Sequence, residues 1–127
     1  MRARGGGVRN QDEFRLSCSV SDFFARALPT RALWTHFPAG EKRSEATGAR
    51  LKRMGMQRGW PDYLVILDGK TFGIELKAGK GKLSDVQLAV ADAFVANGAP
   101  WVCARSTQEV EAFLIDQGVQ LRARISA

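Results

Sequence analysis

The chain has 127 residues, of which 45% are hydrophobic and 25% are charged, the composition of one ordinary globular domain. This composition excludes a disordered, collagen-like or coiled-coil protein, and the longest apolar run, residues 63–67, is far shorter than a membrane-spanning helix. Two cysteines and one histidine, scattered along the chain, make a poor zinc site. No hydrophobic segment follows the first arginines, so we expect neither a secretory signal nor membrane association, and a cytoplasmic location.

The net charge of +6 is concentrated in the middle of the chain. Residues 42–82 hold ten lysines and arginines against four acidic residues, a local excess that equals the net charge of the whole chain. A concentrated basic region suggests a polyanionic partner, most often nucleic acid. A solvated, lysine-rich surface explains the same charge equally well, so charge by itself does not choose between the two.

The N-terminal region predicts a basic arm followed by a long helix. Residues 1–10 contain three consecutive glycines and show no periodicity, so we expect a flexible arm there and a single domain over residues 11–127. Asp12 is the expected cap of a helix from about Glu13 to Leu28. The buried stripe of this helix recurs at helical spacing and consists of Leu16, Val20, Phe24 and Ala27.

The clearest local signal is a β-hairpin over residues 62–77. Two apolar runs flank an Asp-Gly pair at 68–69, and this pair favours a two-residue type I′ turn. The register of that turn places Asp62 directly opposite Glu75, with Lys77 on the same face. The other face is wholly apolar and is expected to lie in the core; it consists of Tyr63, Val65, Leu67, Phe72, Ile74 and Leu76.

Caps and breakers define the remaining elements and the fold class. In chain order they are a short strand over residues 34–37, a helix from Ser44 to about Met54, a helix from Ser84 to about Asn97, a strand over 100–104, a helix from Ser106 to about Gln117, and a short strand within 119–127. Strands and helices that alternate in this way predict an α/β sandwich, built on a small mixed sheet flanked by helices.

The polar face of the hairpin predicts metal chemistry. Two carboxylates side by side repel each other, so the pair Asp62 and Glu75 is costly without a cation. Mg²⁺ takes one or two carboxylates and completes its shell with water and substrate phosphate, and Lys77 would orient water or stabilise phosphate charge. These residues favour metal-assisted phosphodiester hydrolysis. The alternative is a solvent-facing ion pair of Glu75 with Lys77, which is common and weak.

The same residues resemble the VRR-NUC domain, a branch of the PD-(D/E)xK nuclease superfamily. The resemblance covers about residues 13–118 and rests on a basic segment at 50–55 and on Gly59-Trp60-Pro61-Asp62, Glu75-Leu76-Lys77, Gly81-Lys82-Leu83-Ser84 and Gln87. It implies a restriction-endonuclease-like αβββαβ core, of the stand-alone type found in phages and bacteria. The chain differs from the family pattern at two places. It has Ala39-Gly40 where many relatives have Asn-Gly, and the Val-Arg-Arg pattern of some members appears only as Ala104-Arg105-Ser106. Neither place includes an expected metal ligand.

The resemblance also implies roles for the site residues. Asp62, Glu75 and the backbone carbonyl of Leu76 would hold Mg²⁺ or Mn²⁺, and Lys77 would be the catalytic lysine. His36 is expected to pack within its strand and not to act as a base.

Two further residues have an alternative, purely structural explanation. By the resemblance, Glu13 lies where the family has an acid on its first helix, and it would reach the metal through water. Asp12 or Asp22 could correspond to that acid instead. The helix dipole explains an acid in the first turn equally well. Gln87 faces the sheet and would support the lysine or a phosphate in the site, yet it also completes a capping box with Ser84.

The resemblance therefore predicts a DNA endonuclease that depends on Mg²⁺ or Mn²⁺ and needs no small-molecule cofactor. It implies a homodimer that cuts branched or junction DNA in a bacterial or phage-infected cell. The alternatives are a non-catalytic nucleic-acid-binding module of the same fold and a replication or repair adaptor. The expected DNA contacts are basic and comprise Lys42, Arg43, Arg50, Lys52, Arg53, Arg58, Lys80 and Lys82.

Overall fold

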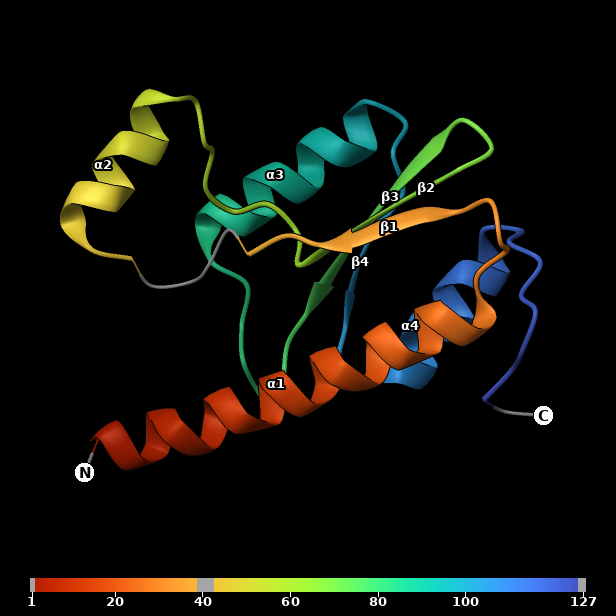
Figure 1. Ribbon diagram of the computed structural model, residues 1–127, viewed down its shortest axis with the longest axis horizontal. Coiled ribbons are helices and arrows are strands. Elements are labelled where there is room, and N and C mark those ends of the chain that lie inside the picture. The colour runs from red at the N-terminus through yellow and green to blue at the C-terminus, as the bar shows by residue number, and fades with distance from the viewer. Residues whose placement is uncertain (1, 39–42, 126–127) are drawn as a thin grey trace.

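The computed structural model describes residues 2–38 and 43–125, with side chains from residue 11 onward (Figure 1). Its elements, in chain order, are α1 (Arg2–Ala27), β1 (Leu33–His36), α2 (Glu45–Arg53), β2 (Tyr63–Leu67), β3 (Lys70–Leu76), α3 (Asp85–Ala96), β4 (Trp101–Ala104) and α4 (Thr107–Asp116). None of the described helices combines the length and the apolar character needed to cross a membrane. The predicted order of elements is confirmed from the first helix to the last.

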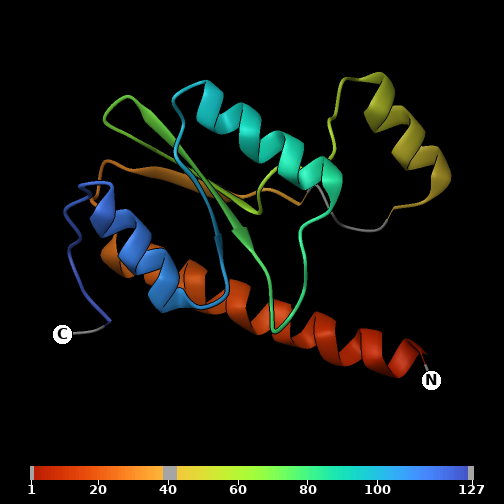
Figure 2. The same cartoon turned by 180° about the vertical axis from the view of Figure 1, so that it is seen from behind.

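The described strands form one mixed sheet in the order β1-β2-β3-β4. β1 and β3 each pair antiparallel with β2, whereas β4 runs parallel to β3. A parallel pair needs a crossover connection, and α3 supplies it. α1 and α4 cover one face of the sheet and α3 covers the other, while α2 lies beside α3 and away from the sheet (Figures 1 and 2). The predicted α/β sandwich on a mixed sheet is confirmed.

The core lies between the sheet and the layer made by α1 and α4. The hairpin face predicted to be apolar is buried there along its whole length. α1 contributes the predicted Val20, Phe24 and Ala27, while Leu16 is half-buried at the edge of the core. Each large apolar side chain buried in this way contributes about 1.5–3 kcal/mol. The hairpin is therefore fixed through its apolar face, and its polar side chains lie on the opposite face.

The turn of the hairpin has the predicted geometry. Asp68 and Gly69 have φ angles of 52° and 80°, as a type I′ turn requires. Tyr63 pairs with Ile74, the register that the Asp-Gly turn predicts. Arg31 donates two hydrogen bonds to the Asp68 carboxylate, at 2.8 and 2.6 Å, and this lowers the pKa of Asp68. The pair is exposed, so it fixes the turn position more than it adds stability.

α1 begins at Arg2, which corrects the prediction of a flexible arm over residues 1–10 and of a helix start near Glu13. The three glycines in this segment led to that prediction, because each costs a helix about 1 kcal/mol relative to alanine. Starting a helix is costly, whereas extending one adds a hydrogen bond for each residue fixed. The packed part of α1 supplies the start, and the backbone continues the helix through the glycines.

The C-terminal segment is also different from its prediction, since the described residues 119–125 contain no strand. Instead, the backbone N–H of Arg122 donates to the Ala27 carbonyl at 2.6 Å. The guanidinium group of Arg122 donates to the carbonyls of Leu28 and Ala25. Carbonyls at the end of a helix have no partner within it. The segment therefore caps α1 and does not extend the sheet.

Candidate active site

The open end of the β2–β3 hairpin brings three of the predicted side chains together. Asp62 and Glu75 lie one step beyond the last paired residues of the hairpin, on the sheet face that α3 covers. The backbone N–H of Leu76 donates to Asp62 Oδ2 at 2.7 Å. Lys77 Nζ lies 3.8 Å from Glu75 Oε2. The structure therefore groups two carboxylates and one lysine at this end of the hairpin.

Both carboxyl groups have a raised pKa. Glu75 is only 3% exposed, and burial, followed by the charge of Asp62, raises the pKa of Glu75 to about 8. Lys77 acts in the opposite direction but does not cancel these effects. Burial also raises the pKa of Asp62, against the hydrogen bond from Leu76. At neutral pH the pair therefore carries less than two negative charges unless a cation joins it.

Gln87, in the first turn of α3, serves the helix and the site at once. Its Oε1 accepts from the backbone N–H of Ser84 at 2.9 Å, and its own backbone N–H donates to Ser84 Oγ at 3.1 Å, which is a complete capping box. Its Nε2 donates to Glu75 Oε2 at 3.0 Å. Gln87 can therefore both cap the helix and support the site, because its amide oxygen serves the cap and its amide nitrogen contacts Glu75. The cap holds the amide and the amide holds Glu75.

The donor set fits a hard divalent cation. Mg²⁺ and Mn²⁺ prefer oxygen, and a buried Glu75 beside a half-buried, repelling Asp62 is the environment that such an ion relieves. The N–H of Leu76 points toward Asp62, and the N–H and C=O of one strand residue point to the same side, so the Leu76 carbonyl faces the pair. The described residues contain no group of three His, Cys, Asp or Glu side chains placed to hold a metal. A cation at this place would therefore have two carboxylates and a carbonyl as oxygen donors from the described residues.

α1 adds one acid to the surroundings of the pair. Glu13 is half-buried, and its negative charge contributes to the raised pKa of Asp62. Asp12 is exposed, and neither it nor Asp22, the other acids considered for this place, is among the groups that act on Asp62. The structure therefore favours Glu13 over the other two as the acid nearest the site. It acts through space and makes no hydrogen bond to Asp62 in the described chain.

His36 is the residue that sequence reasoning placed wrongly. It is exposed on β1 and not packed within the strand. Its ring contacts the ring of Tyr63 with centroids 5.2 Å apart, and its charge lowers the pKa of Asp62. The cause is the β1–β2 register, which pairs His36 with Tyr63, the neighbour of Asp62. Only that register, which the sequence does not specify, could have revealed the proximity.

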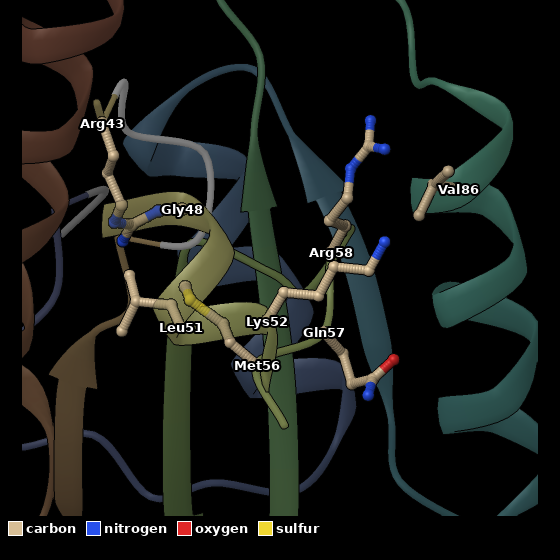
Figure 3. A pocket seen from close by; sticks show the side chains of 8 residues that line it. All are labelled: Arg43, Gly48, Leu51, Lys52, Met56, Gln57, Arg58 and Val86. Atoms are coloured by element: carbon tan, nitrogen blue, oxygen red, sulfur yellow. The ribbon is translucent and has the colours of Figure 1, made fainter. Parts of the chain in front are cut away.

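The predicted basic residues separate into three groups. Arg43, Lys52 and Arg58 line a cavity of about 510 Å³ between α2 and the start of α3 (Figure 3). Arg50 and Arg53 are exposed on α2 and do not line this cavity.

The third group lies on the loop between β3 and α3, where Lys80 and Lys82 are both exposed. Arg105 steadies this loop by donating to the Gly79 carbonyl at 2.9 Å. The tip of the loop lies next to α1 in both views (Figures 1 and 2). Lys42 lies outside the described residues.

Comparison with known proteins supports the fold. No family model matches the chain, and no curated protein matches it. A solved structure described as "VRR_NUC domain" is similar with a TM-score of 0.54, and the match covers 83% of this chain and 95% of that one at 24% sequence identity. The chain therefore has the fold of a VRR_NUC domain, a restriction-endonuclease-like α/β fold, as the resemblance in its sequence predicted.

Proposed function

We propose that this protein is a divalent-metal-dependent endodeoxyribonuclease of the PD-(D/E)xK type. One observation carries the proposal: the hairpin end holds Asp62 and Glu75 together at the cost of raised pKa values, with Lys77 beside them. A purely structural ion pair would need one acid and one base, and it would not need a second carboxyl group with a raised pKa. The VRR_NUC-like fold supports the same conclusion.

The chain's own residues suit the steps of phosphodiester hydrolysis. Asp62, Glu75 and the Leu76 carbonyl would hold Mg²⁺ or Mn²⁺, with Glu13 contributing through a water. A bound cation of this kind polarises the phosphoryl oxygen and makes a nearby water more acidic. Lys77 lies close enough to Glu75 to orient the attacking water or to stabilise charge developing on the phosphate.

Gln87 would act as a positioning residue in the same site. It fixes the Glu75 carboxylate through a hydrogen bond of 3.0 Å and is itself held by the helix cap. Held in this way, Glu75 has little rotational freedom to lose when a cation binds.

The substrate we propose is branched or junction DNA. The basic residues on α2 and on the 77–84 loop would contact the phosphates of two arms. A homodimer would present two such sites to a two-fold branched substrate. We keep a cytoplasmic location in a bacterial or phage-infected cell as part of this proposal.

The test is a cleavage assay on linear, flapped and four-way branched DNA in Mg²⁺, Mn²⁺ or EDTA. We expect cleavage in either metal, none in EDTA, and none by Glu75→Gln or Asp62→Asn. Asp92→Asn, an exposed acid on α3, is the matched control and should cut like the wild type. Binding to DNA without cleavage in any metal would reject the nuclease and favour the non-catalytic binding module.

A further inference from the structure

The cavity between α2 and α3 is a second feature that the proposed chemistry does not use. Its volume of about 510 Å³ lies in the range of small-molecule sites, which is about 300–1,000 Å³. Leu51, Met56 and Val86 give it an apolar surface, and Lys52 and Arg58 bring positive charge. A ligand that suits it must therefore combine an apolar body with a negative group.

The charged residues of the cavity are available to such a ligand. Lys52 and Arg58 are exposed, and neither side chain has a hydrogen bond or an ion pair with the described residues. Figure 3 shows the Lys52 side chain extending from α2 toward α3, where Val86 lies, while the Arg58 side chain points toward the top of the view. Arg43, on the opposite side, donates to the Pro38 carbonyl at 2.8 Å and is held in place. Two unrestrained cations above an apolar surface can follow a phosphate backbone.

Gly48 keeps the cavity open. It lies within α2, where glycine costs about 1 kcal/mol relative to alanine, and its backbone does not have the positive φ that would require glycine. A Cβ built at this position meets no atom within 4 Å. The helix would therefore be more stable with almost any other residue here. Gly48 lines the cavity, so the absence of a side chain at this position leaves space for a ligand.

The cavity and the candidate active site share one turn of helix. Val86 lines the cavity, and the next residue, Gln87, donates to Glu75. On the other wall, Gly59 follows the cavity residue Arg58, and a Cβ on Gly59 would lie 2.6 Å from Val86 Cγ1. The chain therefore packs directly against α3 between the cavity and Asp62. The cavity and the carboxylate pair are therefore joined through neighbouring residues of α3.

We propose that this cavity holds one unpaired nucleotide of a DNA strand, with the base against the apolar surface and the adjoining phosphates at Lys52 and Arg58. The inference rests on the proposed function, because the cavity would be the part of the nuclease that recognises the structure of the DNA substrate. A base inside a duplex is stacked and paired and cannot enter, whereas a base at a flap, a branch or a single-stranded end can. The cavity then explains a preference for branched DNA without any contact to base sequence.

The test measures binding in EDTA, where no cleavage occurs, by fluorescence anisotropy of a labelled duplex with and without a single-stranded overhang. We expect the wild type to bind the overhang DNA about tenfold more tightly, the effect of burying one base. Gly48→Leu places the branched side chain of a good helix former in the cavity, where it occupies part of the space that a base needs. It should remove this preference and leave the binding of the blunt duplex unchanged. Gly48→Ala, which leaves most of the space free, should keep the preference.

A second measurement does not depend on the variants. Wild-type protein should bind an overhang of abasic nucleotides about as weakly as the blunt duplex, because the phosphates remain and the bases are gone. Equal affinity for abasic and normal overhangs would overturn the proposal, and so would an overhang preference that survives Gly48→Leu. If the binding results are as expected and no metal supports cleavage, the cavity assignment stands and the proposed nuclease activity fails.

Discussion

The hairpin end and α2 carry the two kinds of polar group that the proposed activity needs, and they are built in opposite ways. Asp62 and Glu75 belong to a hairpin whose inner face is buried, and each carboxyl group is fixed by a hydrogen bond. α2 has no buried residue, and its cationic side chains lie on its exposed surface. Chemistry needs groups held to a fraction of an ångström, whereas contact with a flexible polyanion needs charge that can follow it. Substitutions in the two regions should therefore have different consequences.

The largest effect is expected from the carboxylate pair. Asp62→Asn or Glu75→Gln should abolish detectable cleavage while DNA binding in EDTA stays the same or rises. Asp62→Asn removes the charge that repels Glu75, and Glu75→Gln replaces a carboxyl group that is largely neutral at pH 7, so the metal-free stability should hold or increase. Amide replacements are the right choice, because Glu75→Ala would also leave a hole in a packed site. Thermal unfolding without metal and a cleavage time course measure the two quantities, and full activity in either variant would refute the site.

Lys77→Ala should slow cleavage by about a hundredfold, with less than about a twofold change in DNA affinity. The lysine serves charge that develops during reaction more than it serves binding, so the rate falls and the affinity does not. Single-turnover rates and anisotropy in Ca²⁺ separate the two. Lys70→Ala, an exposed lysine at the other end of β3, is the control. Parallel decreases in rate and affinity would make Lys77 a phosphate contact of the same kind as those on α2.

The raised pKa of Glu75 predicts a pH dependence of stability in the metal-free protein. Its folded-state pKa of about 8 lies above its ordinary value of 4.5, so the folded state binds the proton more tightly than the unfolded state. The resulting stability is complete below about pH 4.5 and is lost as pH rises through 8, with a slope of at most about 1.4 kcal/mol per pH unit. Urea unfolding between about pH 5 and 9 measures it.

Glu75→Gln gives the control for this slope, since the amide does not titrate and the decline should flatten. Saturating Mg²⁺ should restore stability at high pH, because the cation takes the place of the proton. A decline that is identical in wild type and Glu75→Gln would show that another group causes it.

A smaller effect is expected on the salt dependence of DNA binding, and it distinguishes basic residues that line the cavity from those that do not. Lys52→Ala with Arg58→Ala should lower the slope of log affinity against log salt by about 1–2, because each cation removed leaves one phosphate with its counterion. Arg50→Ala with Arg53→Ala removes the same charge from outside the cavity and should change the slope less. Equal changes for the two pairs would mean that α2 acts as a diffuse positive surface and that the cavity has no special place on the DNA path.

Features set by local sequence were predictable, whereas features set by contacts between distant segments were not. The hairpin was predictable to the residue, because an Asp-Gly turn fixes its register and strict alternation assigns its faces. Helix caps such as Ser44 and Ser84 were predictable for a similar reason, since a single side chain satisfies the first free N–H groups.

Features that depend on contacts between distant segments were not predictable. The position of His36 beside Asp62 requires the register of β1 on β2, and no tight turn links those strands. The C-terminal segment caps α1 through Arg122, which lies far from that helix in the sequence. The helical start at Arg2 depends on propagation from a packed helix, which local propensity does not measure.

The proposed activity requires a divalent cation bound by Asp62 and Glu75, and paramagnetic broadening tests this most directly. Mn²⁺ added in small amounts to ¹⁵N-labelled protein should first broaden the amide signals nearest the pair, those of Leu76, Lys77 and Gln87. The same titration of Asp62→Asn or Glu75→Gln should leave these signals sharp, while Asp92→Asn should behave as the wild type. Broadening that begins elsewhere, or that is unchanged in both site variants, would contradict the assignment of the metal site to the hairpin end.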